Sequence, residues 1–157
     1  MIDQDSFRAV LGRFASGVTV ITALDEGGHD QGMTVSAFCS LSLDPPLILF
    51  CVDHAASMYE SFEKATSFIA NILSESQEPL ARRFSGSDPN RFDGIGYERG
   101  INGVAILDDV LGYLECRRVA SHPGGDHCIY VGEVELAQCM EGRPLLYYRG
   151  GYAQLER

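Results

Sequence analysis

The apolar positions at the start of the chain follow the period of a helix. They recur at spacings of three and four residues, at Phe7, Val10, Leu11 and Phe14, and so share one face. Asp3 is suited to cap the first turn, and Gly17 is suited to end the element. The pattern predicts an amphipathic helix that ends at Gly17.

Shorter apolar runs separated by turn residues predict strands in the next part of the chain. Runs over 18–22 and 32–38 flank a turn at 26–30, so we expect a hairpin. The run 47–51 follows Asp44-Pro45-Pro46 and is apolar throughout, which predicts a strand covered on both faces. A further strand is expected over 67–73.

The second half of the chain alternates short helices with longer strands. We expect helices over 55–64 and 77–84, and a surface loop over 86–103. Strands over 110–121 and 127–139 flank a turn at 122–126, and a last hairpin holds the tyrosines at 147, 148 and 152. Helices are few and strands return by hairpins, so the pattern predicts a mainly β (α+β) fold. Its antiparallel sheet closes into a small barrel with a few surrounding helices. The length of 157 residues predicts one domain, 1–157.

The charge of the chain excludes some partners. Twelve basic residues against twenty-two acidic ones give a formal net charge of −10. This charge repels phosphate backbones and anionic lipids, so we expect neither nucleic acid nor membrane as a partner. The five cysteines include no CxxC pair, and Asp3 and Asp5 are wrong for the basic start of a signal peptide. We therefore expect a cytoplasmic protein.

Several chemistries leave no motif in this chain. The four histidines lack the close pairing of a metal site, so we expect no metal. The nucleophile elbow, the phosphate-binding loop of NTPases and the glycine fingerprint of dinucleotide-binding folds are all missing. The residues alone leave the ligand open.

A series of segments, in order along the chain, resembles one known family. The segment 32–38 (GMTVSAF) leads through 40–46 (SLSLDPP) into 47–51 (LILFC), and similar matches occur at 14–20, 71–73, 91–92, 125–127 and 144–152. Together they resemble the flavin reductase-like family, whose fold is the FMN-binding split barrel, from residue 7 to residue 155.

The resemblance implies an activity and partners. Members of the family are homodimers that bind FMN or FAD near the subunit interface. They pass a hydride from NADH or NADPH to the flavin and often release the reduced flavin to a partner monooxygenase. The resemblance therefore implies an NAD(P)H-dependent flavin reductase. Two alternatives stay open: a non-catalytic flavin-binding or electron-transfer protein, and a flavin-mediated ferric reductase.

The resemblance also implies roles for individual residues. The segment that would line the flavin ring comprises Met33, Thr34, Val35, Ser36 and Ala37. Ser40 would add a hydroxyl, and Cys51 and Ser57 would flank a second flavin-contacting turn. Arg82 or Arg83, beside Phe84, would supply positive charge for a phosphate. His127 would position the nicotinamide, with Tyr148 and Tyr152 packed near the pocket.

Each of these residues also has a purely structural interpretation. Thr34 and Val35 suit any strand, and the two arginines suit the solvated face of a short helix. His127 follows a turn and suits an exposed hairpin position, while the tyrosines suit a core or an interface. The choice between FMN and FAD, and between NADH and NADPH, stays open.

Overall fold

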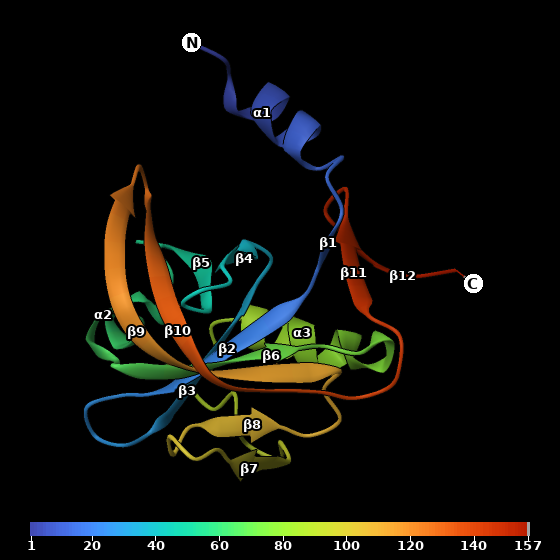
Figure 1. Cartoon of the computed structure of the whole chain (residues 1–157). Helices are drawn as coiled ribbons and strands as arrows, with labels where there is room; N and C mark the ends of the chain where they lie inside the picture. Colours follow the sequence, from blue (N-terminus) through green and yellow to red (C-terminus); the bar gives the residue numbers. More distant parts are fainter. Residues whose placement is uncertain (157) are drawn as a thin grey trace.

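The computed structural model describes residues 1–156, so Arg157 of the predicted domain lies outside the described residues. The helices are α1 (Gln4–Leu11), α2 (Tyr59–Lys64) and α3 (Glu78–Ser85), and a 3₁₀ turn spans Glu75–Gln77. The first strands are β1 (Ser16–Gly17), β2 (Thr19–Leu24), β3 (Asp30–Val35), β4 (Phe38–Ser42), β5 (Leu47–Asp53) and β6 (Ser67–Ile72). The remaining strands are β7 (Tyr97–Arg99), β8 (Ala105–Leu107), β9 (Gly112–Gly124), β10 (His127–Cys139), β11 (Leu145–Tyr148) and β12 (Gly151–Gln154) (Figure 1).

A seven-stranded antiparallel sheet forms the body of the molecule. Its strand order is β3-β2-β6-β9-β10-β5-β4, and the long strands β9 and β10 bend strongly across it (Figure 1). The register of their pairing shifts at two places, and such bulges sharpen the bend of a strand. The edge strands β3 and β4 are consecutive in the chain but are not paired with one another among the described residues. A hydrogen bond of 3.0 Å from the Cys51 N–H to the Ala37 carbonyl links β5 to the segment between β3 and β4. The predicted β-rich antiparallel fold, a split barrel with few helices, is confirmed.

The barrel interior is filled by aromatic and aliphatic side chains. Phe50 packs edge-on against Phe68 with ring centroids 4.9 Å apart, and Tyr130 lies 5.4 Å from Phe50. Along β5 only alternate residues are buried, and the others are half-buried. The prediction that residues 47–51 are covered on both faces is therefore wrong for a single chain, because only the inward face of β5 meets the core.

A second core lies between α3, the sheet and the strands β8 and β11. Phe84 is fully buried there, and its ring lies 5.1 Å from that of Phe92. Gly32 of β3 lies against this ring, since a Cβ atom at Gly32 would stand 2.7 Å from Phe84. Close packing of Phe84 on β3 therefore fixes α3 against the sheet edge.

Several predicted elements differ from the structure. The strand predicted over 32–38 ends at Val35, because the chain leaves the sheet at residues 36–37 before β4. The first helix is capped by Asp3, whose carboxylate accepts the Ser6 N–H at 2.8 Å, but it ends at Leu11. Gly17 instead lies in β1, because residues 16–17 pair with β11 in the small sheet of β1, β11 and β12. The helix predicted over 55–64 begins only at Tyr59, and the loop predicted over 86–103 contains β7, which pairs with β8.

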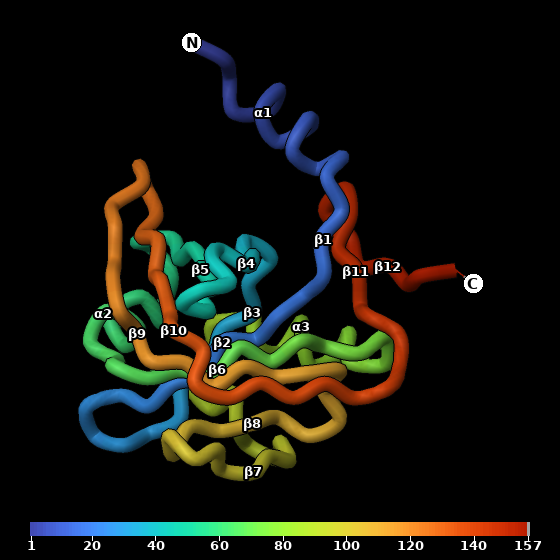
Figure 2. Tube along the Cα trace, in the orientation of Figure 1, coloured from blue at the N-terminus to red at the C-terminus, as the bar shows by residue number. Residues whose placement is uncertain are grey.

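Helix α1 stands away from the rest of the chain and buries none of its residues (Figures 1 and 2). None of the helices in the described residues has the length and apolar character needed to cross a membrane.

Candidate active site

A cleft of about 360 Å³ opens where the end of β3 meets α3 and the last hairpin. We call it the first cleft. Five of its lining residues were expected at a binding site from the sequence: Thr34, Val35, Ser36, Arg82 and Tyr152. Four further lining residues were not: Val18, Ser85, Tyr147 and Gly150. Residues far apart in the sequence thus form one concave surface with hydroxyl groups, aromatic rings and a guanidinium.

The two predicted arginines of α3 have different surroundings. Arg82 lines the first cleft, where its guanidinium lies 4.9 Å from the centre of the Tyr152 ring and its Nε donates to Glu78 at 3.2 Å. Arg83 instead donates to three backbone carbonyls, those of Asn90, Arg91 and Asp93, at 2.6–3.0 Å. Arg83 therefore holds the loop after α3, and Arg82 is the arginine that faces the first cleft.

The segment between β3 and β4 presents backbone to solvent. Thr34 donates its hydroxyl proton to the Ala81 carbonyl at 2.7 Å and so anchors β3 to α3. Ser36 and Ala37 follow and are exposed, and within the described residues their N–H groups donate to no backbone carbonyl. Exposed donors on a fixed turn are suited to bind the acceptor atoms of a ligand.

Other predicted residues lie outside the first cleft. Met33 is half-buried against the barrel core, and Phe84 is fully buried in the second core. Ser40 is exposed on the edge strand β4, and Tyr148 is exposed at the end of β11. Cys51 is half-buried on β5, where burial raises the pKa of its thiol and the nearby Cys39 and Cys128 raise it further.

Arg91 belongs to one of the segments that resemble the family, but it was not among the predicted site residues. It is only 4% exposed, and its guanidinium donates to four carbonyls: Gly32 at 2.8 Å, Phe84 and Asp88 each at 3.2 Å, and Gly86. It also donates to Ser57 Oγ at 2.9 Å. Ser57, which was predicted to flank a flavin-contacting turn, thus binds Arg91 in this structure. Loss of hydration lowers the pKa of Arg91 from its ordinary value. Arg91 thus ties β3, the end of α3 and the turn after β5 together behind the first cleft.

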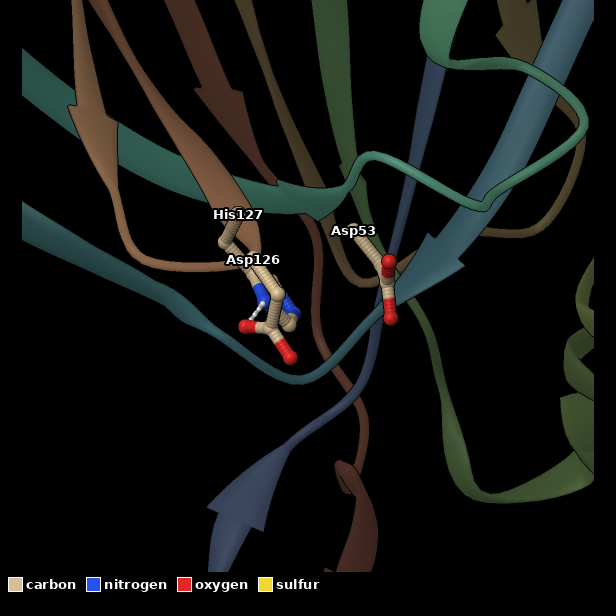
Figure 3. Close-up of side chains that lie close together, drawn as sticks. All are labelled: Asp53, Asp126 and His127. Carbon is tan, nitrogen blue, oxygen red and sulfur yellow. Dashed lines mark hydrogen bonds and ion pairs between the residues drawn. The ribbon is translucent and has the colours of Figure 1, made fainter.

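His127 lies in a different part of the chain, at the start of β10. Its Nδ1 lies 2.7 Å from a carboxylate oxygen of Asp126, and its Cα is in register with Asp53 of β5 (Figure 3). The hydrogen bond with His127 is the main cause that lowers the pKa of Asp126, followed by the charge of His127. Side-chain atoms of Asp53, Asp126 and His127 that could bind a metal ion lie within 4.8 Å of one another. Asp53 and Asp126 are 73 positions apart in the sequence, so no short motif reveals the grouping.

The geometry of β5 relates His127 to the first cleft. His127 does not line this cleft, but its partner Asp53 is two residues from Cys51 on the same strand face. The backbone N–H of Cys51 donates to the carbonyl of Ala37, which follows the lining residue Ser36. Two residues of strand span about 7 Å, so His127 and the turn at Ser36–Ala37 flank one outward face of β5.

Residues 11–156 match the model of a family described as the flavin reductase like domain. The chain belongs to this family. The reductase component of 4-hydroxyphenylacetate 3-monooxygenase from Thermus thermophilus is 42% identical over 155 residues, which are 97% of this chain and 97% of that protein. An FMN reductase (NADH) of Agrobacterium fabrum is 41% identical over 152 residues, 97% of this chain and 86% of that protein.

Solved structures of flavin reductases have the same fold. An NADH:FAD oxidoreductase of Streptomyces globisporus, in complex with NAD and FAD fragments, superposes with a TM-score of 0.92 at 32% identity, covering 98% of this chain and 93% of that one. The predicted family, fold and enzyme class, an NAD(P)H-dependent flavin reductase, are thus confirmed. The roles of the individual site residues stay predictions.

Proposed function

We propose that this chain reduces FMN or FAD with NADH or NADPH by hydride transfer and supplies the reduced flavin to a partner monooxygenase. Relatives across nearly the full chain are named as reductase components of such systems. The observation that carries the proposal is the first cleft, in which Arg82 supplies positive charge at an opening lined by hydroxyl groups and aromatic rings.

The residues of the first cleft fit a flavin nucleotide. A flavin has a flat ring, a hydroxylated chain and an anionic phosphate, and each needs a different surface. In a chain with a net charge of −10, an exposed guanidinium is needed to attract the phosphate. Gly150 contributes backbone at a φ of +77°, and a Cβ there would meet nothing within 4 Å, so the cleft stays open on that side. When bound, the flavin supplies the two-electron acceptor for the hydride of the nicotinamide.

We assign the binding roles to specific groups. The guanidinium of Arg82 binds the phosphate, since its terminal N–H groups can donate to two phosphate oxygens at once while Nε–H donates to Glu78. The free N–H groups of Ser36 and Ala37 bind polar atoms of the ring edge. Thr34, which lines the first cleft, and Arg91, which does not, hold β3 in place against α3.

His127 positions the nicotinamide. The lowered pKa of Asp126 keeps its carboxylate ionised at neutral pH, and an ionised carboxylate only accepts hydrogen bonds. The proton on the His127 Nδ1 is therefore directed to Asp126, which fixes the ring and leaves Nε2 for the carboxamide of the nicotinamide. Orientation is what a hydride transfer between two cofactors requires of the protein.

We propose that the working form is a homodimer. The apolar face of α1 and its extension are exposed, with Phe7 at 55%, Val10 at 66% and Phe14 at 82%. Large apolar side chains on a projecting helix mark an interaction surface, and a second copy of the chain is the occupant we propose. The single domain and the cytoplasm are likewise proposals, supported by the match over 11–156 and by five free cysteines.

The test is oxidation of NADH and of NADPH by the flavin-stripped protein, with and without added FMN or FAD. We expect turnover that requires free flavin and saturates with it. Arg82→Gln is expected to raise the flavin KM by roughly tenfold, the loss of one charge-assisted contact. The matched control Arg117→Gln removes an exposed arginine that pairs with Glu133, and it should leave this KM unchanged. Tight flavin binding without turnover would instead indicate a flavin-binding protein.

A further inference from the structure

The two carboxylates beside His127 come from turns that the backbone holds side by side. Asp53 ends β5, and Asp126 lies in the hairpin between β9 and β10. The His54 N–H donates to the Asp126 carbonyl at 3.0 Å, and Asp53 lies directly opposite His127 in the pairing of β5 with β10. Backbone hydrogen bonds therefore fix the relative positions of the three residues.

The imidazole of His127 has one ring nitrogen that is engaged and one that is open. Nδ1 lies 2.7 Å from a carboxylate oxygen of Asp126, and an ionised carboxylate can only accept the proton there. Nε2 has no hydrogen-bond partner among the described residues, and Figure 3 shows it on the side of the ring toward Asp53. A histidine that ligates a metal ion almost always donates its other N–H to a carboxylate or carbonyl, which is the arrangement of His127.

The Asp53 carboxylate supplies a second ligand, of opposite charge to a cation. Its Oδ1 accepts the Ala55 N–H at 2.8 Å, and within the described residues its Oδ2 accepts no hydrogen bond. Ligand atoms of Asp53, Asp126 and His127 lie within 4.8 Å of one another. Two ligands of a tetrahedral zinc ion are about 3–3.5 Å apart, because each bond is about 2 Å long. A small rotation of the Asp53 side chain is therefore enough to bring its free oxygen and His127 Nε2 onto one ion.

The ligand chemistry favours Zn²⁺ over the harder divalent ions. Mg²⁺ and Ca²⁺ prefer oxygen ligands alone, whereas an imidazole nitrogen together with carboxylate oxygen suits Zn²⁺. The net charge of −10 also attracts cations to this protein. No metal was expected from the sequence because its histidines lack close pairing, but the fold brings carboxylates to His127 in place of a second histidine.

We propose that Zn²⁺ binds His127 Nε2 and the Asp53 carboxylate, with Asp126 orienting the imidazole and water completing the coordination. We further propose that the bound ion inhibits the reductase by competing with the nicotinamide cofactor. The inhibition rests on the proposed function, in which the same Nε2 receives the carboxamide of the nicotinamide. One lone pair cannot serve both, so the two ligands exclude each other. The metal site itself does not depend on that function.

The metal site is tested by isothermal titration of ZnCl₂ into flavin-free protein, with no cofactor present. We expect one saturable site per chain that is lost in His127→Ala and roughly tenfold weaker in Asp53→Asn, since a charged ligand is replaced by a neutral one. Asparagine keeps an oxygen for the Ala55 N–H, so the turn is expected to persist. MgCl₂ should not bind at this site.

The matched control is His29→Ala, which removes the histidine of another pair with an aspartate and should bind Zn²⁺ like the parent protein. Absence of Zn²⁺ binding, or equal binding in the parent and His127→Ala, would refute the metal site.

The competition is tested by steady-state oxidation of NADH, with FMN as acceptor, at several Zn²⁺ concentrations. We expect Zn²⁺ to raise KM for NADH with kcat unchanged, and Asp53→Asn to require roughly tenfold more Zn²⁺ for the same relative rise. Inhibition that saturating NADH does not relieve would refute the competition. Zn²⁺ binding at His127 in a protein without turnover would refute the proposed function and support the metal site, whereas turnover without Zn²⁺ binding would refute the metal site alone.

Discussion

At the scale of single residues, Arg91 is the side chain that we expect to matter most for stability. It is nearly buried and donates to four carbonyls and one hydroxyl. Arg91→Met keeps much of the volume but leaves these acceptors without a donor, at a cost on the order of 1–3 kcal/mol for each that water cannot reach. Chemical denaturation should show a marked loss of stability. The control is Arg82→Met, which removes an exposed guanidinium from α3 and should change stability by less than about 0.5 kcal/mol. Equal stability of the two variants would contradict this account.

The contact between Asp126 and His127 makes a second prediction at this scale. The pKa of Asp126 is lowered from 3.8, so the carboxylate contributes stabilisation above that value and loses it as pH falls through the folded-state pKa. An NMR titration of the Asp126 carboxyl carbon should show a midpoint below 3.8, and His127→Ala should move it upward. Asp126→Asn should raise KM for NADH roughly threefold to tenfold with little change in flavin KM. The control for this KM is Asp25→Asn, which alters the similar pair of Asp25 and His29 and should leave the KM for NADH unchanged. An unchanged midpoint in His127→Ala would refute the assigned cause.

At the scale of elements, the sequence pattern predicts strands well where apolar residues alternate between turns. The bounds of β10 agree with the prediction, and the predicted hairpin of β2 and β3 is present, because the turns carry glycine, proline or aspartate. The end of β3 at Val35 was not predicted. The pattern carries no information on long-range contacts: Arg91 bonds to Gly32 across 59 residues, and Arg82 differs from Arg83 only by its direction on α3. Most of the fold was therefore predictable from the sequence. Which polar residue faces the first cleft could not be predicted, because it depends on how α3 packs against the sheet.

Gly32 offers a test of how packing on one strand supports the site. A Cβ there would lie 2.7 Å from the ring of Phe84, so Gly32→Ala must displace either β3 or α3. We expect a destabilisation of about 1–3 kcal/mol, typical of an overpacked core, together with weaker flavin binding. Thermal unfolding and flavin titration measure the two effects. Gly17→Ala is the matched control, because a Cβ there meets nothing within 4 Å. Flavin affinity that survives in Gly32→Ala would show that the position of β3 does not set the first cleft.

At the scale of the whole molecule, the question is what covers α1. This helix buries none of its residues, although its sequence has the apolar stripe of a packed helix. If a second copy of the chain covers α1, size-exclusion chromatography with light scattering should give the parent protein a mass of twice the 17.2 kDa of one chain. Phe7→Asp combined with Val10→Asp should yield monomers, because two charges on the stripe would be buried without partners. Arg8→Gln, on the polar side of the same helix, should remain dimeric.

The monomeric variant should also lose flavin affinity if the outward face of β5, between His127 and the first cleft, is completed by the second copy. A parent protein that elutes as a monomer at micromolar concentration would refute the homodimer and leave the site to be completed within one chain.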